Sequence, residues 1–299
     1  MTDRQVLSEP QWRAQAEAHR RRVEPWIEPR LQRRRDGRRD PVDDFLWQYY
    51  RWRPGQLAAW HPGIGITLAG DTPWAGRHPY VRTPHGWTVQ FGADDPIRPR
   101  LTRNLAILRA TADRPARTGC FGMHEWAMVH DVDADDIRHR QVPLRLDRDQ
   151  IAAAVADVGL HCTHFDAYRF FTPSAAVLQR PLTRTGQVDD EQPGCLHAGM
   201  DLYRYAYEAA PYAGSDLVAD CFAHARRARE LDMRASPYDL TAAGLRPIPV
   251  ETAAGRGEYV RLQREFATAA AELRGRLIDR LTRTVQSSAT WGPEAAQSA

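Results

Sequence analysis

The sequence predicts a predominantly helical α+β protein with one hydrophobic core, a small sheet and an N-terminal helical arm. Three observations support this class. Apolar side chains recur at helical spacing towards both ends of the chain, and short β-type runs split by Gly, Pro and Asp gather between residues 64 and 92. The 299 residues are 42% hydrophobic, which is ordinary for a chain that buries one large core.

The N-terminal segments have helical patterns. Residues 10–35 predict a charged helical region that we expect to be interrupted near Pro25 and Pro29, because proline removes a helix hydrogen bond. Residues 42–50 place aromatic and apolar side chains on one helical face, and residues 54–60 start with a proline suited to a first helical turn.

The middle of the chain mixes strands and helices. Residues 64–92 predict a small antiparallel sheet, and residues 98–112 a helix. Residues 142–165 have the pattern strand, helix, strand. Three further helices are expected after Pro193: 195–209, 215–232 and about 256–284.

The charge distribution divides the chain. Residues 1–39 hold 11 arginines against six acidic residues, a net charge of +5, whereas the remaining residues are slightly acidic; there is no lysine anywhere. We therefore expect a basic helical arm at 1–40, a single α+β catalytic domain at 41–285 and a polar flexible tail at 286–299. If nucleic acid is a partner, arginines of the arm would contact its phosphates: Arg33, Arg34, Arg35, Arg38 and Arg39.

The expected location is the cytoplasm. No apolar run approaches the roughly 20 residues needed to cross a bilayer, so no membrane association is expected. The first residues lack the apolar segment of a secretory signal. Four cysteines are too few for a disulfide framework in a chain of this length.

Four short segments place ionisable groups among aromatic and small residues: 119–130, 161–171, 194–203 and 231–239. A buried carboxylate is costly unless it is paired, and a raised pKa would suit it to acid or base chemistry. The candidate catalytic residues are Glu125, Asp166, His197 and Asp201.

Each candidate also has a structural interpretation. Glu125 could form an ion pair that joins two elements. If residues 161–166 are extended, His164 and Asp166 share a face, which suits a base or a ligand pair but also a core strand. His197 and Asp201 stand at i and i+4, a spacing that serves a metal, an oriented imidazole or an ordinary helix-surface ion pair.

Aromatic side chains and arginines in the same segments are candidate substrate contacts. Arg234, close to hydroxyl groups, could hold a phosphate or carboxylate, or could pair with the last carbonyls of a helix. The full set of candidate substrate-binding residues is Trp126, Tyr168, Arg169, Phe170, Tyr203, Arg234 and Tyr238.

A divalent metal, iron or zinc, is a possible cofactor. Every cysteine has a histidine close downstream, as in mixed Cys/His sites, although there is no paired CxxC and buried free cysteine is the commoner interpretation. Asp220 and His224 are one helical turn apart and could contribute to a helical iron site. The possible metal ligands are His124, His161, His164, His197, Asp201, Asp220 and His224.

Several stretches together resemble a family of high-GC bacterial proteins usually labelled 3-methyladenine DNA glycosylase. The resemblance implies base excision from a nucleobase-containing substrate but transfers no catalytic residue. Its stretches cover most of the chain: Pro41–Leu46 with Tyr49-Tyr50 and Arg53-Pro54, Phe121–Val129, Cys162–Pro173, Gln192–Tyr203 and Leu231–Leu240.

Three functions follow as hypotheses. The first is a nucleobase-directed N-glycosidase, a hydrolase with a buried carboxylate and an aromatic pocket for the flipped base. The alternative is a metal-dependent enzyme acting on a small molecule, and the second alternative is a non-enzymatic binding protein. The sequence has no Gly-rich dinucleotide fingerprint, phosphate loop or GxSxG elbow, and the lack of lysine excludes Schiff-base chemistry.

Overall fold

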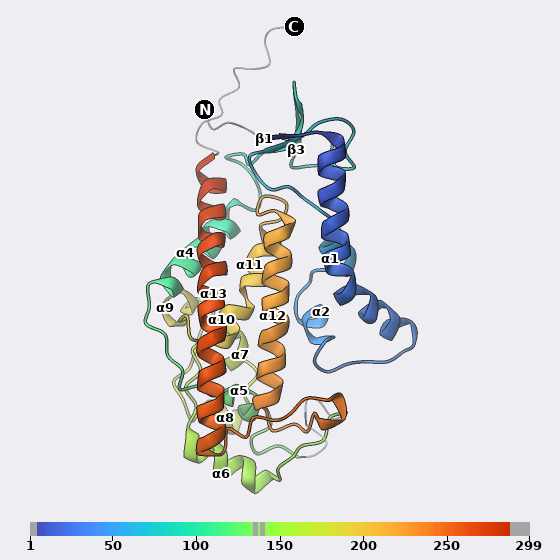
Figure 1. The fold of residues 1–299 in the computed structure, drawn as a ribbon. Helices are drawn as coiled ribbons and strands as arrows, with labels where there is room; N and C mark the ends of the chain where they lie inside the picture. Colours follow the sequence, from blue (N-terminus) through green and yellow to red (C-terminus); the bar gives the residue numbers. More distant parts are fainter. Residues whose placement is uncertain (1–4, 134–136, 138–140, 288–299) are drawn as a thin grey trace.

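Two long helices form the axis of the molecule. In the computed structural model, which describes residues 5–133, 137 and 141–287, α12 (Ser215–Ala235) and α13 (Ala253–Ser287) pack along one another (Figure 1). Both helices have a stripe of apolar residues at helical spacing, and its burial holds them together. The buried stripe of α13 contains Tyr259, Phe266, Ala270, Leu277 and Leu281.

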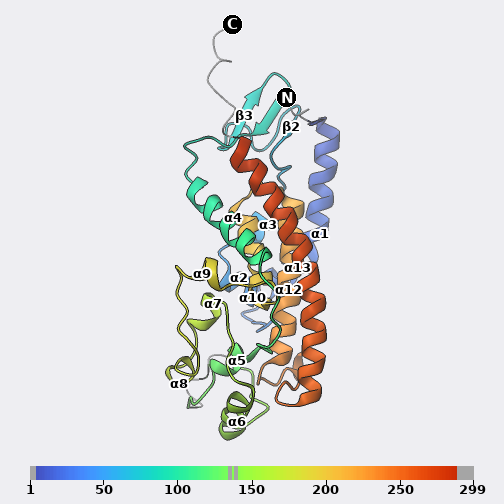
Figure 2. The same cartoon turned by 90° about the vertical axis from the view of Figure 1, so that its left-hand side faces the viewer.

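Shorter helices surround this pair. Helix α4 (Arg98–Ala112) packs on α13, and most of the short helices lie on the same side of the bundle (Figure 2). The predominantly helical α+β class is thereby confirmed. The remaining helices are α2 (Phe45–Tyr49), α3 (Pro54–Ala58), α5 (Met123–Ala127), α6 (Arg148–Val158), α7 (Phe165–Tyr168), α8 (Pro173–Ala176), α9 (Gln187–Asp190), α10 (Leu196–Met200), α11 (Leu202–Glu208) and the 3-10 helix η2 (Thr241–Ala243).

Helix α1 (Glu9–Arg35) is continuous, so the expected interruption at Pro25 and Pro29 is wrong. Both prolines lie on the exposed face of the helix, where water can satisfy the carbonyls that lose a partner. Val23 and Ile27 are buried on the opposite face and hold the helix against the body. Figure 1 shows the later part of α1 bending away from the bundle axis.

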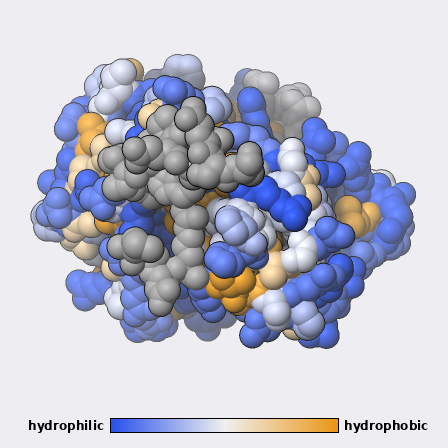
Figure 3. Space-filling model, turned by 90° about the horizontal axis from the view of Figure 1, so that it is seen from above, coloured by the Kyte–Doolittle hydropathy of each residue, from blue (hydrophilic) through white to orange (hydrophobic). Residues whose placement is uncertain are grey.

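A four-stranded sheet covers one end of the bundle. Its order is β1-β2-β4-β3, with β1 (Gln5–Leu7), β2 (Ile66–Leu68), β3 (Tyr80–Thr83) and β4 (Gly86–Val89). The strands predicted between 64 and 92 pair antiparallel, but β1 adds to β2 in parallel, so the sheet is mixed. Seen from this end, the surface is mostly hydrophilic with scattered apolar patches (Figure 3).

The strand–helix–strand prediction for residues 142–165 is correct only for its helix, α6. Asp147 caps α6 by accepting from the Gln150 backbone N–H, which explains its sharp start. A strand requires a neighbouring strand to satisfy its backbone, and among the described residues Leu144 forms a single bridge, to Tyr238. The segment before Phe165 is irregular and leads directly into α7.

Only the first residues of the expected C-terminal tail, 286–299, lie within the described part of the chain. Gln286 belongs to α13, whereas residues 288–299 of the predicted tail lie outside the described residues.

Within the part of the chain that the structure describes, no helix is both long enough and apolar enough to span a bilayer.

Candidate metal centre

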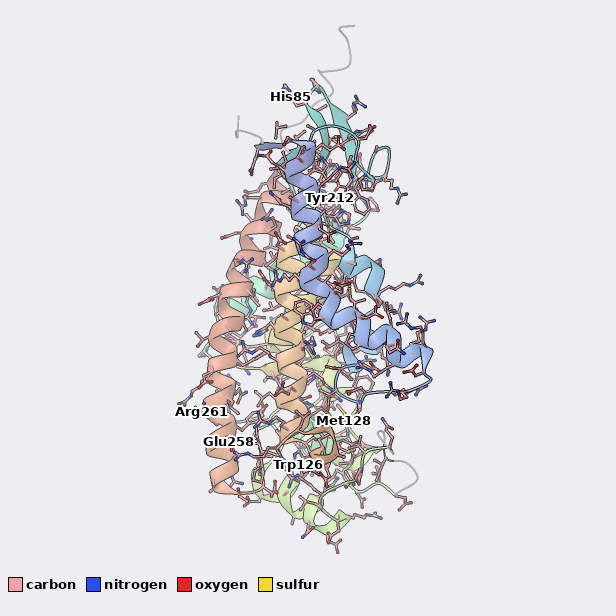
Figure 4. The ribbon with its side chains drawn as sticks, turned by 45° about the vertical axis from the view of Figure 1, so that its right-hand side comes forward. His85, Trp126, Met128, Tyr212, Glu258 and Arg261 are labelled. Carbon is pink, nitrogen blue, oxygen red and sulfur yellow. The ribbon has the colours of Figure 1, made fainter. Side chains whose placement is uncertain are left out.

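All four segments singled out in the sequence meet in the half of the bundle away from the sheet. Trp126, on α5, lies low in the bundle in Figure 4, far from His85 at the sheet end. Its indole N–H donates to the Ala235 carbonyl, 2.9 Å away, and so joins α5 to the end of α12. Gly122 precedes α5 with φ +71°, and a Cβ there would come within 3.3 Å of the Ala235 Cβ. Glycine at 122 therefore lets α5 approach α12 closely.

His124, His197 and Asp232 converge in the interior, and we call them the His–Asp cluster. All three are buried, at 6, 8 and 2% exposure, and each offers a ligand atom within 4.8 Å of the others. His124 Nε2 lies 2.8 Å from Asp232 Oδ1, and the two imidazole rings are perpendicular, with centroids 4.4 Å apart. The two atoms contact each other as an ion pair, and Asp232 Oδ1 has no other ion-pair or hydrogen-bond partner among the described residues. A carboxylate oxygen can accept more than one hydrogen bond, so this buried atom keeps free acceptor capacity.

A buried ion pair lies beside the His–Asp cluster. Arg229, 1% exposed on α12, donates to Glu125 Oε1 at 2.7 Å and lies 3.5 Å from Asp232 Oδ2. Its guanidinium also stacks over the Phe45 ring at 3.9 Å. Arg229 therefore fixes Glu125 and one oxygen of Asp232, and it leaves the other Asp232 oxygen facing the histidines.

The two histidines of the cluster differ electrostatically. Burial and the nearby His124 hold the pKa of His197 well below its ordinary value, so this imidazole is neutral at physiological pH. Burial also disfavours the charged form of His124, but the carboxylate of Asp232, with a smaller contribution from Glu125, outweighs it and raises the pKa of His124. The neutral imidazole of His197 beside the Asp232 carboxylate is a donor set that transition metals take, and metal binding would also require His124 to release any proton that it shares with Asp232.

A second cluster surrounds His164, which is fully buried between two carboxylates. Its Nδ1 lies 2.9 Å from Glu191 Oε1 and its Nε2 lies 3.3 Å from Asp201 Oδ2. Burial lowers the pKa of His164, but the charge of Glu191 and the contact with Asp201 outweigh it and raise the pKa to about 10. His164 is thus an imidazolium, and it belongs to a charge network rather than to a set of empty ligands.

Arginines neutralise the remaining carboxylates of this second cluster. Asp201 accepts from the Tyr50 hydroxyl at 2.7 Å and pairs with Arg204 at 2.7 Å. Burial would raise the pKa of Asp201, but Arg204 and His164 reverse this effect and lower it. Asp166 pairs with Arg204 at 2.8 Å and with two further arginines, Arg169 and Arg184. His164, Asp166 and Asp201 also have ligand atoms within 4.8 Å of one another, but cations already satisfy them.

The two clusters are adjacent. The His164 and His197 rings stack with centroids 5.3 Å apart. A cavity with room for about one water molecule borders the His–Asp cluster. Both histidines of the cluster and three cysteines line it: Cys120, Cys162 and Cys195. Burial raises the pKa of the Cys162 thiol to about 12, so a neutral thiol faces this space.

The structure brings several predicted site residues together, though not always as predicted. Glu125, His124 and His197 meet at the His–Asp cluster. His164, Asp166 and Asp201 meet beside it. The predicted extended segment at 161–166 is wrong, because Asp166 lies in α7 and His164 directly precedes it. Within the described residues, the hydrogen bonds and ion pairs of Asp201 go to Tyr50, His164 and Arg204, and none joins it to His197.

Three predicted metal ligands belong to neither cluster. Asp220 pairs with Arg22 and Arg276 at the surface. His224, although one turn along the same helix, stacks on Phe266 with centroids 3.9 Å apart. His161 is exposed at the cavity rim. The helical iron site built from Asp220 and His224 is therefore absent from the arrangement of these described side chains.

The predicted substrate-contact residues do not share one pocket. Trp126, Tyr203 and Tyr238 are packed in the core, at 0, 1 and 1% exposure. Arg169 pairs with Asp166, and Arg234 donates to the Arg246 carbonyl. Tyr168 and Phe170 are half-buried.

The arginines of the N-terminal arm are partly neutralised by ion pairs. Arg33 pairs with Asp44 at 2.7 Å, and Arg35 and Arg38 pair with Glu28 and Asp36. Among the described contacts, Arg34 and Arg39 have no ion pair. A phosphate contact by this arm stays a prediction.

Three residues of these clusters were not predicted from the sequence as site residues: Asp232, Arg229 and Glu191. Asp232 lies between Leu231 and Met233, but Glu230 and Arg234 flank this pair, so its surroundings are much less apolar than those of Glu125. Arg229 and Glu191 have no comparable signal, because their burial depends on how distant helices meet.

Taken together, the fold and these clusters define a helical α+β protein with a buried histidine–carboxylate centre. Comparison with known proteins finds no matching family model, no matching curated protein and no matching solved structure.

Proposed function

We propose that this protein is a metal-dependent enzyme with a mononuclear centre held by His124, His197 and Asp232. The observation that carries the proposal is the convergence of three buried ligand atoms, among which Asp232 Oδ1 has only the His124 imidazole as a partner within the described residues. A buried carboxylate is costly unless its oxygens are well paired. A divalent cation satisfies all three atoms together.

The donor set supports zinc or iron. Two imidazoles and one carboxylate occur in catalytic zinc sites and in non-haem iron sites, and both leave positions open for water or substrate. Ligand atoms around such a metal lie about 3.3 Å apart, so His124 Nε2 and Asp232 Oδ1, now 2.8 Å apart, would separate slightly. A bound metal would polarise a substrate or lower the pKa of a bound water.

The adjacent cavity indicates a small substrate. It borders His124 and His197 and has room for about one water molecule.

Glu125 lies beside the centre and accepts a hydrogen bond from Arg229, which in turn contacts Asp232. The Glu125 carboxylate therefore orients Arg229, and Arg229 orients Asp232. We therefore assign Glu125 a positioning role and not the role of proton-transfer group.

Base excision, which the family resemblance implies, ranks behind the metal proposal. It requires an accessible carboxylate and an aromatic pocket. Glu125 and Asp166 are bound by arginines, and Trp126 and Tyr203 lie inside the core. N-glycosidase activity would need these side chains to be exposed by a rearrangement, and it stays a prediction.

Metal analysis tests the proposal. Protein purified without chelator or nickel resin should contain, or take up on titration, about one equivalent of zinc or iron. Asp232→Asn and His197→Gln should each lose most of that metal. Asp166→Asn is the matched control, since it also neutralises a buried aspartate beside a histidine, and it should retain the metal. Circular dichroism confirms that each variant is folded.

Two outcomes would overturn the proposal. The first is a wild-type protein that binds neither metal tightly. The second is a loss of metal in folded Asp166→Asn that equals the loss in folded Asp232→Asn, which would move the centre to the second cluster.

A further inference from the structure

A pocket on another part of the bundle gathers four arginines. It has a volume of about 380 Å³, within the range of small-molecule sites, and opens to solvent. Arg100, Arg103 and Asn104 come from the start of α4, Arg204 and Glu208 from α11, and Arg184 from the segment before α9. Figure 2 shows α4 and α9 on the same side of the bundle.

The charge of this pocket is not balanced. Arg184 and Arg204 pair inwards with Asp166, and Arg204 also pairs with Asp201. The hydrogen bonds of Arg103 go to neutral groups, the Gln187 side chain at 2.9 Å and a backbone carbonyl at 3.5 Å. Arg100 has no hydrogen bond or ion pair among the described contacts. Arg100 and Arg103 therefore have no ion-pair partner among the described contacts, and the four arginines of the lining outnumber its one acidic residue, Glu208.

The helix at the pocket wall adds to this positive potential. Helix α4 has no acidic residue in its first turn and no side-chain N-cap, yet it places Arg100 and Arg103 within its first two turns. Cations at a helix N-terminus are disfavoured by the helix dipole. An anion held by these arginines would relieve the repulsion.

We propose that this pocket binds the phosphate group of a small phosphate monoester. A tetrahedral phosphate presents three terminal oxygens, which suits guanidinium groups that approach from different elements, whereas one carboxylate is satisfied by a single bidentate arginine. The acidic member of the pocket, Glu208, accepts from the Asn104 side-chain amide at 2.8 Å. Its remaining acceptor capacity favours a ligand that also carries hydroxyl groups.

The pocket is distinct from the proposed metal centre but connected to it. Arg204 joins the pocket wall to Asp201, Asp201 contacts His164, and His164 stacks on His197. The phosphate site does not depend on the metal, because none of its lining residues belongs to the His–Asp cluster.

The test is isothermal titration of the full chain with ribose 5-phosphate and with ribose. We expect saturable binding of one equivalent of ribose 5-phosphate and none of ribose. The double variant Arg100→Gln/Arg103→Gln should weaken binding at least tenfold. The matched control is Arg261→Gln/Arg264→Gln, which removes the same charge from the exposed face of α13, with Arg261 in the early part of that helix (Figure 4). Metal content should not change in either double variant.

Three results would overturn the assignment. One is the absence of saturable binding by wild-type protein. Another is an equal loss of affinity in the two double variants, which would mean only general electrostatic attraction. The third is tighter binding of a 12-nucleotide oligothymidylate that Arg100→Gln/Arg103→Gln abolishes, which would assign the pocket to a nucleic-acid backbone instead.

Discussion

The charge network around Asp201 permits a quantitative prediction. Asp201 is fully buried and contacts a hydroxyl, an arginine and an imidazolium. Asp201→Asn keeps the volume but removes the charge. Breaking a buried ion pair costs about 3–5 kcal/mol. Arg204 still pairs with Asp166, and His164 still pairs with Glu191, so we expect a cost at the low end, about 3 kcal/mol. For a chain of this length that cost corresponds to a fall in Tm of about 5 °C.

The effect of Asp201→Asn should depend on pH. The pKa of His164 is raised from 6.5 to about 10 in the folded protein, so its charged contacts contribute fully below about pH 6.5. That contribution declines as the pH rises towards 10. The difference in Tm between wild type and variant should therefore be largest near pH 6 and should narrow between pH 6.5 and 10.

Thermal unfolding followed by circular dichroism at pH 6, 8 and 10 measures this dependence. Asp166→Asn is the control, because two of its three arginine partners are about half exposed and their ion pairs are screened by water. It should lower Tm less than Asp201→Asn at pH 6. A Tm difference that is constant with pH, or a larger loss in Asp166→Asn, would refute the assignment of an imidazolium to His164.

Other side chains give further predictions that thermal or chemical unfolding can check. Tyr50→Phe removes one hydrogen bond to a buried carboxylate and should cost about 1.5–3 kcal/mol; a cost below about 0.5 kcal/mol would contradict it. Gly199→Ala places a Cβ 2.4 Å from Phe266 Cε1 and should destabilise the protein by about 1–3 kcal/mol, whereas an unchanged midpoint would contradict the close helix contact. Arg229→Gln deprives Glu125 of its guanidinium partner and should cost about 3–5 kcal/mol, together with weaker metal binding; normal metal affinity in this variant would refute the positioning role of the arginine.

Periodicity in the sequence was sufficient to locate the long helices. The pattern at 98–112 matches α4, and the stripe expected at about 256–284 lies within α13. Strand predictions at 142–146 and 160–165 failed, because a short apolar run is equally compatible with an irregular buried segment and only tertiary pairing decides between them. The parallel strand β1 was not predicted, because only its tertiary pairing with β2 makes this short segment a strand.

The candidate site was predictable in composition but not in pairing. The segments chosen for their ionisable residues in apolar surroundings contain His124, His197 and Asp201, and all three are buried. Helical spacing suggested that His197 and Asp201 would pair, but Asp201 lies at the junction of α10 and α11, and its contacts go to His164 and Arg204. Which histidine meets which carboxylate depends on long-range helix packing, and local spacing does not contain that information.

X-ray absorption at the metal edge tests the central claim most directly. For protein loaded with one equivalent of zinc or iron, we predict a first shell of nitrogen and oxygen only, at about 2.0–2.2 Å, with the outer-shell scattering of two imidazole rings. Those rings would be His124 and His197. Sulfur scattering at about 2.3 Å would instead place the metal on the cysteines that line the cavity, and scattering from fewer than two imidazoles would also contradict the His–Asp centre.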